Sequence, residues 1–150
     1  MIDYIKGNLA EINPTEAIIE CYGIGYRTLI SLQTYEILNG KTEVKVFIHH
    51  YIREDEELYY GFASKDEREL FRLLISVSGI GASTARMMLS SLTSDEIRNA
   101  ILSEDINKIK SIKGIGSVVS RMPIYIGRFT DLQMRLLRHM SRQGMLFRGF

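Results

Sequence analysis

The tripeptide Gly-Ile-Gly occurs three times in this chain, and two copies have surroundings that suit phosphate binding. Residues 79–81 lie within LISVSGIGASTARMML and residues 114–116 within INKIKSIKGIGSVVSRM, so each copy follows an apolar helical pattern. In such a helix-hairpin-helix, the glycines let a ligand approach the main chain. The amides that begin the second helix point outward at the positive end of its dipole. The pattern therefore predicts phosphate contacts that read no base sequence.

The first copy has neighbours that could add to such a contact. Ser83 and Thr84 would supply hydroxyl donors and Arg86 a positive charge. A tight turn without a ligand is the alternative for a single copy, and a second copy in the same helical region weakens it. The predicted main-chain contacts are Gly79, Ile80 and Gly81 in the first copy and Gly114, Ile115 and Gly116 in the second.

The third copy, at residues 23–25, lies between two strand-like segments. There the glycines most simply form a hairpin turn or a bulge. We therefore expect a structural role for this copy, which means that the tripeptide alone is weak evidence for binding.

An acidic run, REDEE at residues 53–57, separates two further strand-like segments. Its simplest interpretation is a solvated hairpin tip. On a surface that binds nucleic acid, these carboxylates would repel phosphates and could push two strands apart at a branch point. No metal-ligand spacing accompanies the acids, so a nuclease site is not expected.

The sequence offers no recognisable set of catalytic or metal-binding side chains. His49 and His50 would point to opposite faces of a strand, and Cys21 is the only cysteine, so we expect no zinc site. There is no P-loop for ATP and no Ser/His/Asp or Cys/His signature. We predict no catalytic residue, no metal and no cofactor. The single cysteine, and the lack of a signal-peptide pattern or a run of ~20 apolar residues, favour a cytoplasmic protein without membrane contact.

Two parts of the chain could position these residues, and the first is rich in strands. Five strand-like segments fill residues 1–62 without a long helix between them. Such a set predicts a five-stranded barrel of the oligonucleotide/oligosaccharide-binding (OB) type, with an SH3-like barrel as the alternative. The segments are residues 2–12, 16–22, 26–32, 43–52 and 58–62.

At Ser64 the apolar spacing changes to that of a helix, which places a domain boundary near residues 61–64. Ser64 with Glu67, and Thr93 with Glu96, have the spacing of capping boxes, in which each side chain bonds the other residue's backbone amide. Four or five short helices are predicted over residues 64–116. The fold class is therefore α+β, with the barrel at 1–62 and a helix-hairpin-helix domain at 63–122.

Charge is unevenly distributed, although the net charge is only +1. Residues 1–116 hold 13 lysines and arginines against 17 acids, whereas residues 117–150 hold six arginines, no lysine and one aspartate. Such an imbalance can mark a basic tail that binds nucleic acid, or a segment of different origin.

Residues 1–116 resemble the RuvA family of bacterial Holliday-junction-binding proteins. The resemblance rests on YYGFASKDERELFRLLISVSGIGASTARMML, which follows the acidic run, and on the second copy within IKGIG. It implies that the barrel forms a homotetramer around a fourfold axis and that both helix-hairpin-helix motifs hold the arms of a four-way DNA junction. Ser117 would join the contacts of the second motif. Glu54 and Asp55 would form an acidic pin at the fourfold centre that guides strand separation.

The resemblance also implies partners. A member of this family is a non-catalytic scaffold that acts in recombination and DNA repair. The hexameric ATPase RuvB, recruited by a separate C-terminal domain, moves the DNA through the complex. The RuvC resolvase is a further expected partner.

The stretch after the second copy departs from the family pattern. The family continues with a small residue, Lys-Thr-Ala and an arginine, whereas this chain has SVVSRMP from residue 117, and Pro123 would end or kink a helix after about one turn. We hypothesise that residues 117–150 are read from a shifted frame or replace the original end, with a divergent basic tail that binds DNA as the alternative. On this hypothesis the tail at 123–150 holds no RuvB-binding domain, the second motif is weakened and coupling to RuvB is lost.

Two other functions fit parts of the sequence. A base-excision glycosylase or nuclease could use the same motifs to hold DNA, but it would need a catalytic Lys or Asp that we do not find. A general single-strand binder could use Tyr51, Tyr59 and Tyr60 as stacking platforms on the barrel, although core packing explains these tyrosines more simply. The acidic balance of residues 1–116 argues against a uniformly basic binding surface.

Overall fold

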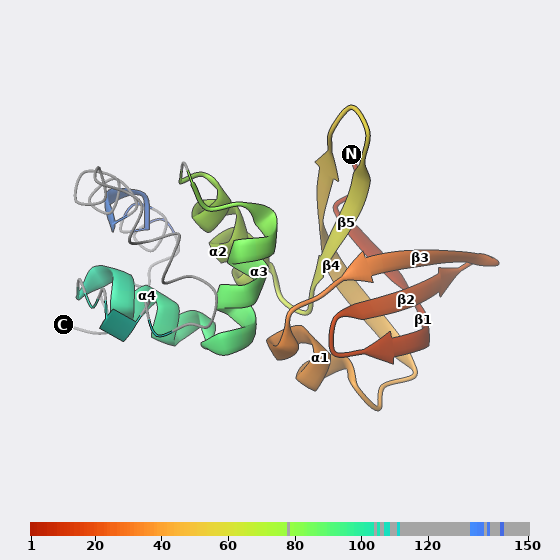
Figure 1. Ribbon diagram of the computed structural model, residues 1–150. Helices are drawn as coiled ribbons and strands as arrows, with labels where there is room; N and C mark the ends of the chain where they lie inside the picture. Colours follow the sequence, from red (N-terminus) through yellow and green to blue (C-terminus); the bar gives the residue numbers. More distant parts are fainter. Residues whose placement is uncertain are drawn as a thin grey trace.

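The computed structural model describes residues 1–77 and 79–103, together with residues 105, 107, 108, 111, 133–136, 138 and 142. A β-barrel forms the N-terminal part, and helices pack at one side of it (Figure 1). Within the described ranges, no helix has the length and apolar character needed to cross a membrane.

The barrel is built from five strands and one short helix. They are β1 (Tyr4–Asn13), β2 (Glu16–Cys21), β3 (Ile24–Leu29), α1 (Leu32–Leu38), β4 (Glu43–Ile52) and β5 (Glu57–Phe62). The strands close into a ring in the order β1-β2-β3-β5-β4, with β1 also paired to β4. All neighbours are antiparallel except β3 and β5, which meet in parallel at Leu29 and Tyr60. The predicted five-stranded barrel is confirmed.

Alternation along β4 shows why these residues form a barrel strand. Val44, Val46 and Ile48 point inward and are at most 4% exposed, whereas Glu43, which precedes them, and Lys45, which lies between the two valines, face solvent. Successive side chains of a strand point to opposite faces, so this spacing buries one face only. The inward residues pack in the barrel interior with Ile5, Ala17, Ile19, Ile30 and Leu38.

The third Gly-Ile-Gly copy, residues 23–25, begins in the turn between β2 and β3. Cys21 pairs with Ile24 across the hairpin, and Tyr22 and Gly23 between them have φ angles of 48° and 82°. Two successive residues with positive φ are typical of the tight two-residue turns that match the twist of a β-hairpin. The structural role predicted for this copy is confirmed.

Three helices follow the barrel: α2 (Lys65–Ile75), α3 (Ala82–Ser91) and α4 (Ser94–Leu102). Their apolar faces form a second core that continues into the barrel, because the Phe71 ring lies 5.0 Å from that of Phe62 and 5.1 Å from that of Tyr60. The predicted capping box at the start of α4 is present in both directions, from Thr93 to Glu96 and back.

The second predicted capping box, at the start of α2, is only half formed. Ser64 Oγ accepts a hydrogen bond from the Glu67 amide, as expected. The Glu67 carboxylate does not return to Ser64 but accepts hydrogen bonds from the hydroxyls of Ser31 and, at 2.7 Å, Thr34 in α1. The reason is burial: Glu67 is 3% exposed, and a buried carboxylate needs donors, of which α1 supplies two.

Two further polar contacts fix the helices against the barrel. The Gln33 side-chain amide in α1 donates to the carbonyls of Leu89 and Leu92 at the end of α3, both at 2.7 Å. The Arg86 guanidinium donates to the Thr15 carbonyl in the turn between β1 and β2, at 3.1 Å. Helix α3 is therefore held against the barrel at its middle and near its C-terminal end.

Part of the chain beyond residue 116 contributes to the helical core. Residues 133–136 are helical, Leu136 is fully buried among the core side chains, and the Gln133 side chain donates to the Ile101 carbonyl at 2.7 Å. Pro123, with its expected effect on a helix, lies outside the described residues.

Candidate nucleic-acid interface

The turn between α2 and α3 has the backbone that the first helix-hairpin-helix motif requires. The Ile80 amide donates to the Val77 carbonyl at 3.1 Å, which closes the turn. Gly79 has a φ of 95°, a conformation that costs an L side chain about 1–2 kcal/mol. Ile80 is half-buried and packs against the helical core. The glycine permits the turn and the isoleucine anchors it.

Helix α3 differs from the other described helices in how it begins. Ser31, Ser64 and Thr93 cap α1, α2 and α4 with their side chains, whereas the N-cap of α3 is Gly81, which has no side chain to bond the first amides. Gly81 is exposed, and a Cβ added there would meet no atom within 4 Å. Free amides, the positive end of the dipole and open space in front of them together suit an anion such as phosphate.

The other predicted residues of this motif lie along α3. Ser83 is exposed near the amide end and lies near the Tyr60 hydroxyl, while Thr84 is half-buried. Burial raises the pKa of Tyr60, and the nearby Arg86 and Ser83 act in the opposite direction. The Arg86 guanidinium reaches the barrel and donates a hydrogen bond to the Thr15 carbonyl, so one of its donors is already used. The structure thus gathers Gly79, Gly81 and Ser83 at one exposed end of α3.

The second motif cannot be placed in the same way. Gly114, Ile115, Gly116 and Ser117 lie outside the described residues, so their contacts stay predictions.

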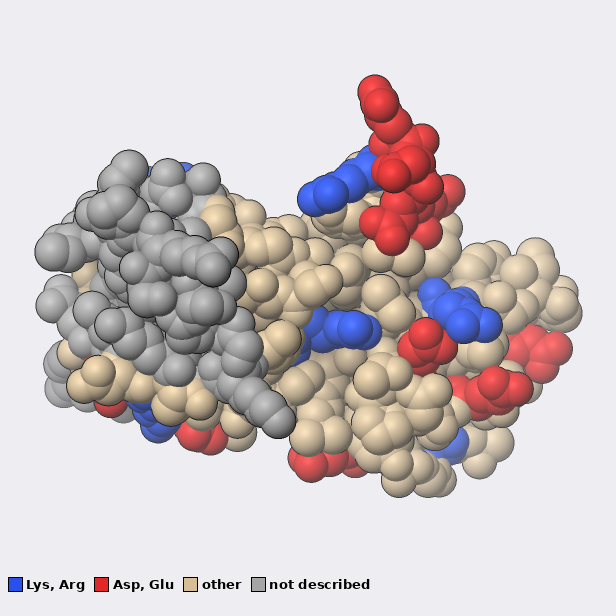
Figure 2. Space-filling model, in the orientation of Figure 1, with Lys and Arg blue, Asp and Glu red and all other residues tan. Residues whose placement is uncertain are grey.

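The acidic run forms the tip of a hairpin made by β4 and β5, which projects beyond the barrel (Figure 1). Residues 52–57 are all exposed, and the Arg53 amide donates to the Glu56 carbonyl at 2.7 Å to close the turn. Figure 2 shows acidic atoms gathered at this projecting tip. Within the described part of the chain, neither Glu54 nor Asp55 takes part in an ion pair. The tip therefore presents uncompensated negative charge.

The tyrosines considered as stacking platforms are occupied by packing. Tyr60 is 3% exposed and belongs to the helical core. Tyr51 meets it edge to face, with ring centroids 6.0 Å apart, and Tyr59 packs against Tyr26 in the same manner. These contacts leave Tyr60 without a face for a base and argue against the single-strand alternative.

Both adjacent histidines are used in protein contacts. Burial, followed by the charge of Arg72, lowers the pKa of His49, whose Nδ1 accepts a hydrogen bond from Arg72 at 3.2 Å. His50 lies 2.7 Å from the Glu57 carboxylate. In the described ranges, no three potential ligands of the His, Cys, Asp and Glu types gather as a metal site would require.

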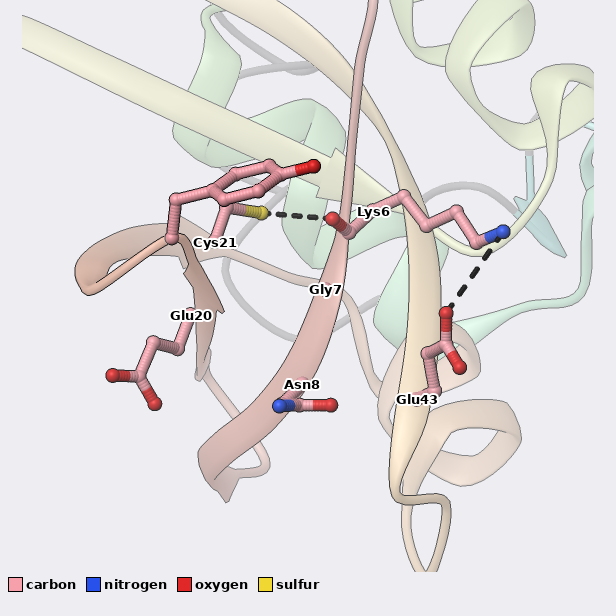
Figure 3. Close-up of a pocket in the computed structure, with 7 residues that line it drawn as sticks. Lys6, Gly7, Asn8, Glu20, Cys21 and Glu43 are labelled. Atoms are coloured by element: carbon pink, nitrogen blue, oxygen red, sulfur yellow. Dashed lines mark hydrogen bonds and ion pairs between the residues drawn. The ribbon is translucent and has the colours of Figure 1, made fainter.

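A shallow hollow of 350 Å³ lies on the outer surface of the barrel, across β1, β2 and β4 (Figure 3). Its polar groups bond one another: the Cys21 thiol donates to the Lys6 carbonyl at 2.8 Å, and the Lys6 ammonium lies 3.8 Å from Glu43. The strands approach closely here, since a Cβ on Gly7 would lie 2.2 Å from the Glu20 carbonyl oxygen. Lys6 and Glu43 in the hollow are therefore paired, whereas Glu20 takes part in no ion pair with the described residues.

Comparison with known proteins points to one family. Residues 1–61 match the family described as the RuvA N-terminal domain, and residues 71–118 match the SAM-like helix-hairpin-helix tandem. The chain is 55% identical over 116 residues to a Bacteroides fragilis protein named Holliday junction branch migration complex subunit RuvA, covering 77% of this chain and 58% of that protein. Proteins with the same name from Christiangramia forsetii and Flavobacterium psychrophilum are 53% and 49% identical over 138 residues, covering 92% of this chain and 69% of each relative.

These alignments set the extent of the similarity. The chain spans 58% of the length of the Bacteroides fragilis relative. An alignment of 138 residues cannot fit within the first 116, so the similarity to the other two relatives continues beyond residue 116. The resemblance thus reaches further along the chain than the sequence patterns indicated, because aligned positions can match where no motif is visible.

Proposed function

The chain belongs to the RuvA family, and from this premise we propose that it binds four-way DNA junctions without regard to base sequence. The observation that carries the proposal is the uncapped start of α3, where Gly81 leaves the first amides open to a phosphate. Gly79, Ile80, Ser83, Thr84 and Arg86 complete this first contact in our proposal.

The projecting hairpin supplies the selectivity for a branched substrate. Glu54 and Asp55 carry uncompensated charge at an exposed tip, which repels the phosphates of a continuous duplex. At a junction the strands already diverge, so the tip can enter between them. We assign to these two carboxylates the acidic pin that guides strand separation.

Family membership supports a proposal for the assembly. In our proposal the barrel at residues 1–62 forms a homotetramer, so that four α3 helices face four junction arms. The second motif, with Gly114, Ile115, Gly116 and Ser117, adds a further phosphate contact on each arm. In our proposal the protein is a non-catalytic scaffold in the bacterial cytoplasm that acts in recombination and repair. RuvB, which supplies the ATP-driven work, and RuvC are the partners expected of the family, and the loss of coupling to RuvB stays a prediction of the shifted-frame hypothesis for residues 117–150.

The proposal is tested by comparing three fluorescent DNAs: a four-way junction, a linear duplex with the sequence of one arm, and one of its single strands. Each is titrated with the protein at moderate salt, and binding is followed by anisotropy. We expect the junction to bind at least about tenfold more tightly than the duplex, because several phosphate contacts form at once. Equal affinity for all three DNAs would contradict the proposal.

A further inference from the structure

The β4–β5 hairpin carries one cation beside its acids, and the structure holds this cation apart from them. The guanidinium carbon of Arg53 lies 5.0 Å from the centroid of the Tyr51 ring, which is a cation–π contact. Two positions along an extended chain place both side chains on the same face. Among the described residues, Arg53 forms no ion pair, although four carboxylates follow it directly.

The face of the β4–β5 hairpin that carries Tyr51 and Arg53 is turned toward the first helix-hairpin-helix motif. Tyr51 packs edge to face against Tyr60, and Tyr60 in turn contacts Phe71 of α2 and has its hydroxyl near Ser83 of α3. A continuous set of contacts therefore leads from Arg53 to the amide end of α3. The hairpin rises beside α2 and α3 in Figure 1, and Figure 2 shows basic atoms on that flank, below the acidic tip.

We propose that Arg53 binds a backbone phosphate of the DNA strand that passes between the hairpin and α3. A guanidinium offers planar paired donors that match a phosphate, and its position on the Tyr51 ring lowers the entropy lost on binding. The hairpin then has two actions: the carboxylates at the tip repel the strands, and Arg53 retains one of them on the side of the motif. This inference rests on the proposed function and names a further contact of the same site.

The test is the salt dependence of DNA binding by Arg53→Gln. Removing one phosphate contact in each subunit should weaken junction binding by at least about 5-fold and reduce the slope of log K against log salt by about 0.7–0.9 for every subunit that contacts the DNA. Arg53→Lys keeps the charge but loses the paired donors, so its slope should match the wild type while its affinity falls. The matched control is Arg27→Gln, which should change neither the affinity nor the salt slope. Arg27 is an exposed arginine on β3 that pairs with Glu16 on β2 at 3.2 Å.

The outcomes separate this inference from the proposed function. If the wild type prefers junctions, and Arg53→Gln shows the same junction affinity and the same salt slope as the wild type, the inference is wrong and the proposed function stands. An equal loss in Arg53→Gln and Arg27→Gln also overturns it, because the effect is then one of net charge. If the wild type does not prefer junctions, the proposed function fails, and the slope measured on the duplex still decides whether Arg53 contacts a phosphate.

Discussion

Replacing Gly81 by aspartate separates the stability of α3 from its proposed contact with DNA. Gly81 has φ −81° and ψ 171°, an extended conformation open to any residue, and an added Cβ has free space. An aspartate there would accept hydrogen bonds from the first-turn amides, which gains a few tenths of a kcal/mol over glycine. Its charge at the positive end of the dipole adds about 0.3–1 kcal/mol.

The two terms together raise the free energy of unfolding by roughly 0.5–1 kcal/mol. For a chain of this size, the melting temperature should then rise by about 1–4 °C. DNA binding should change in the opposite direction, because the aspartate occupies the amides and repels phosphate. Loss of one hydrogen bond to a charged group, about 1.5–3 kcal/mol, corresponds to about 10- to 150-fold weaker junction binding.

The assay is thermal denaturation in parallel with anisotropy titration of a labelled four-way junction. Thr42→Asp makes the same change of charge in the exposed turn before β4 and serves as the control, with expected junction affinity within about twofold of the wild type. If Gly81→Asp folds and binds the junction as tightly as the control, the N-terminus of α3 does not contact a phosphate and the reasoning is refuted.

Three further changes test other parts of the structure. Gly79→Ala should lower the free energy of unfolding by about 1–2 kcal/mol in urea denaturation, because φ is 95° there; unchanged stability would contradict the described turn. Burial raises the pKa of Glu67, so its contribution to stability is present at low pH and is lost as the pH rises through the folded-state pKa. The stability difference between the wild type and Glu67→Gln should therefore be larger near pH ~4 than near pH ~7, and a difference that grows with pH would reverse our assignment. Replacing Glu54 by Gln and Asp55 by Asn together should tighten junction binding roughly fivefold, since each screened repulsion is worth about 0.5 kcal/mol, and weaker binding would argue against a repulsive pin.

Features that depend on neighbours in sequence could be predicted before the structure was known. The alternation of Val44, Val46 and Ile48 marks a strand with one buried face, and the spacing of Thr93 and Glu96 marks the start of α4. Gly23 of the β2–β3 turn and Gly79 have positive φ, as their patterns indicated. Each of these follows from contacts within a few residues, where backbone geometry and side-chain type decide the structure.

The resemblance to a known family also depends on sequence alone, because aligned residues carry it without any knowledge of contacts. The resemblance could not specify which side chains of the first motif remain free to bind DNA. Ser83 and Arg86 both have the expected residue type, yet Ser83 lies near the Tyr60 hydroxyl and Arg86 donates to a carbonyl 71 positions away. Only the folded chain shows that the uncapped amides, rather than these side chains, are the most open part of the motif.

Tertiary structure alone decided how the charged side chains are used. The spacing of Glu67 from Ser64 predicted a reciprocal cap, but burial placed its carboxylate among hydroxyls of α1, with Ser31 lying 36 positions earlier. In the sequence, Arg53 is one member of a charged run. In the structure its guanidinium lies on the ring of Tyr51, which packs edge to face against Tyr60 of the helical core, and this contact sets the direction of the Arg53 side chain. A buried charge must find its partners wherever the fold provides them, and such partners are not adjacent in sequence.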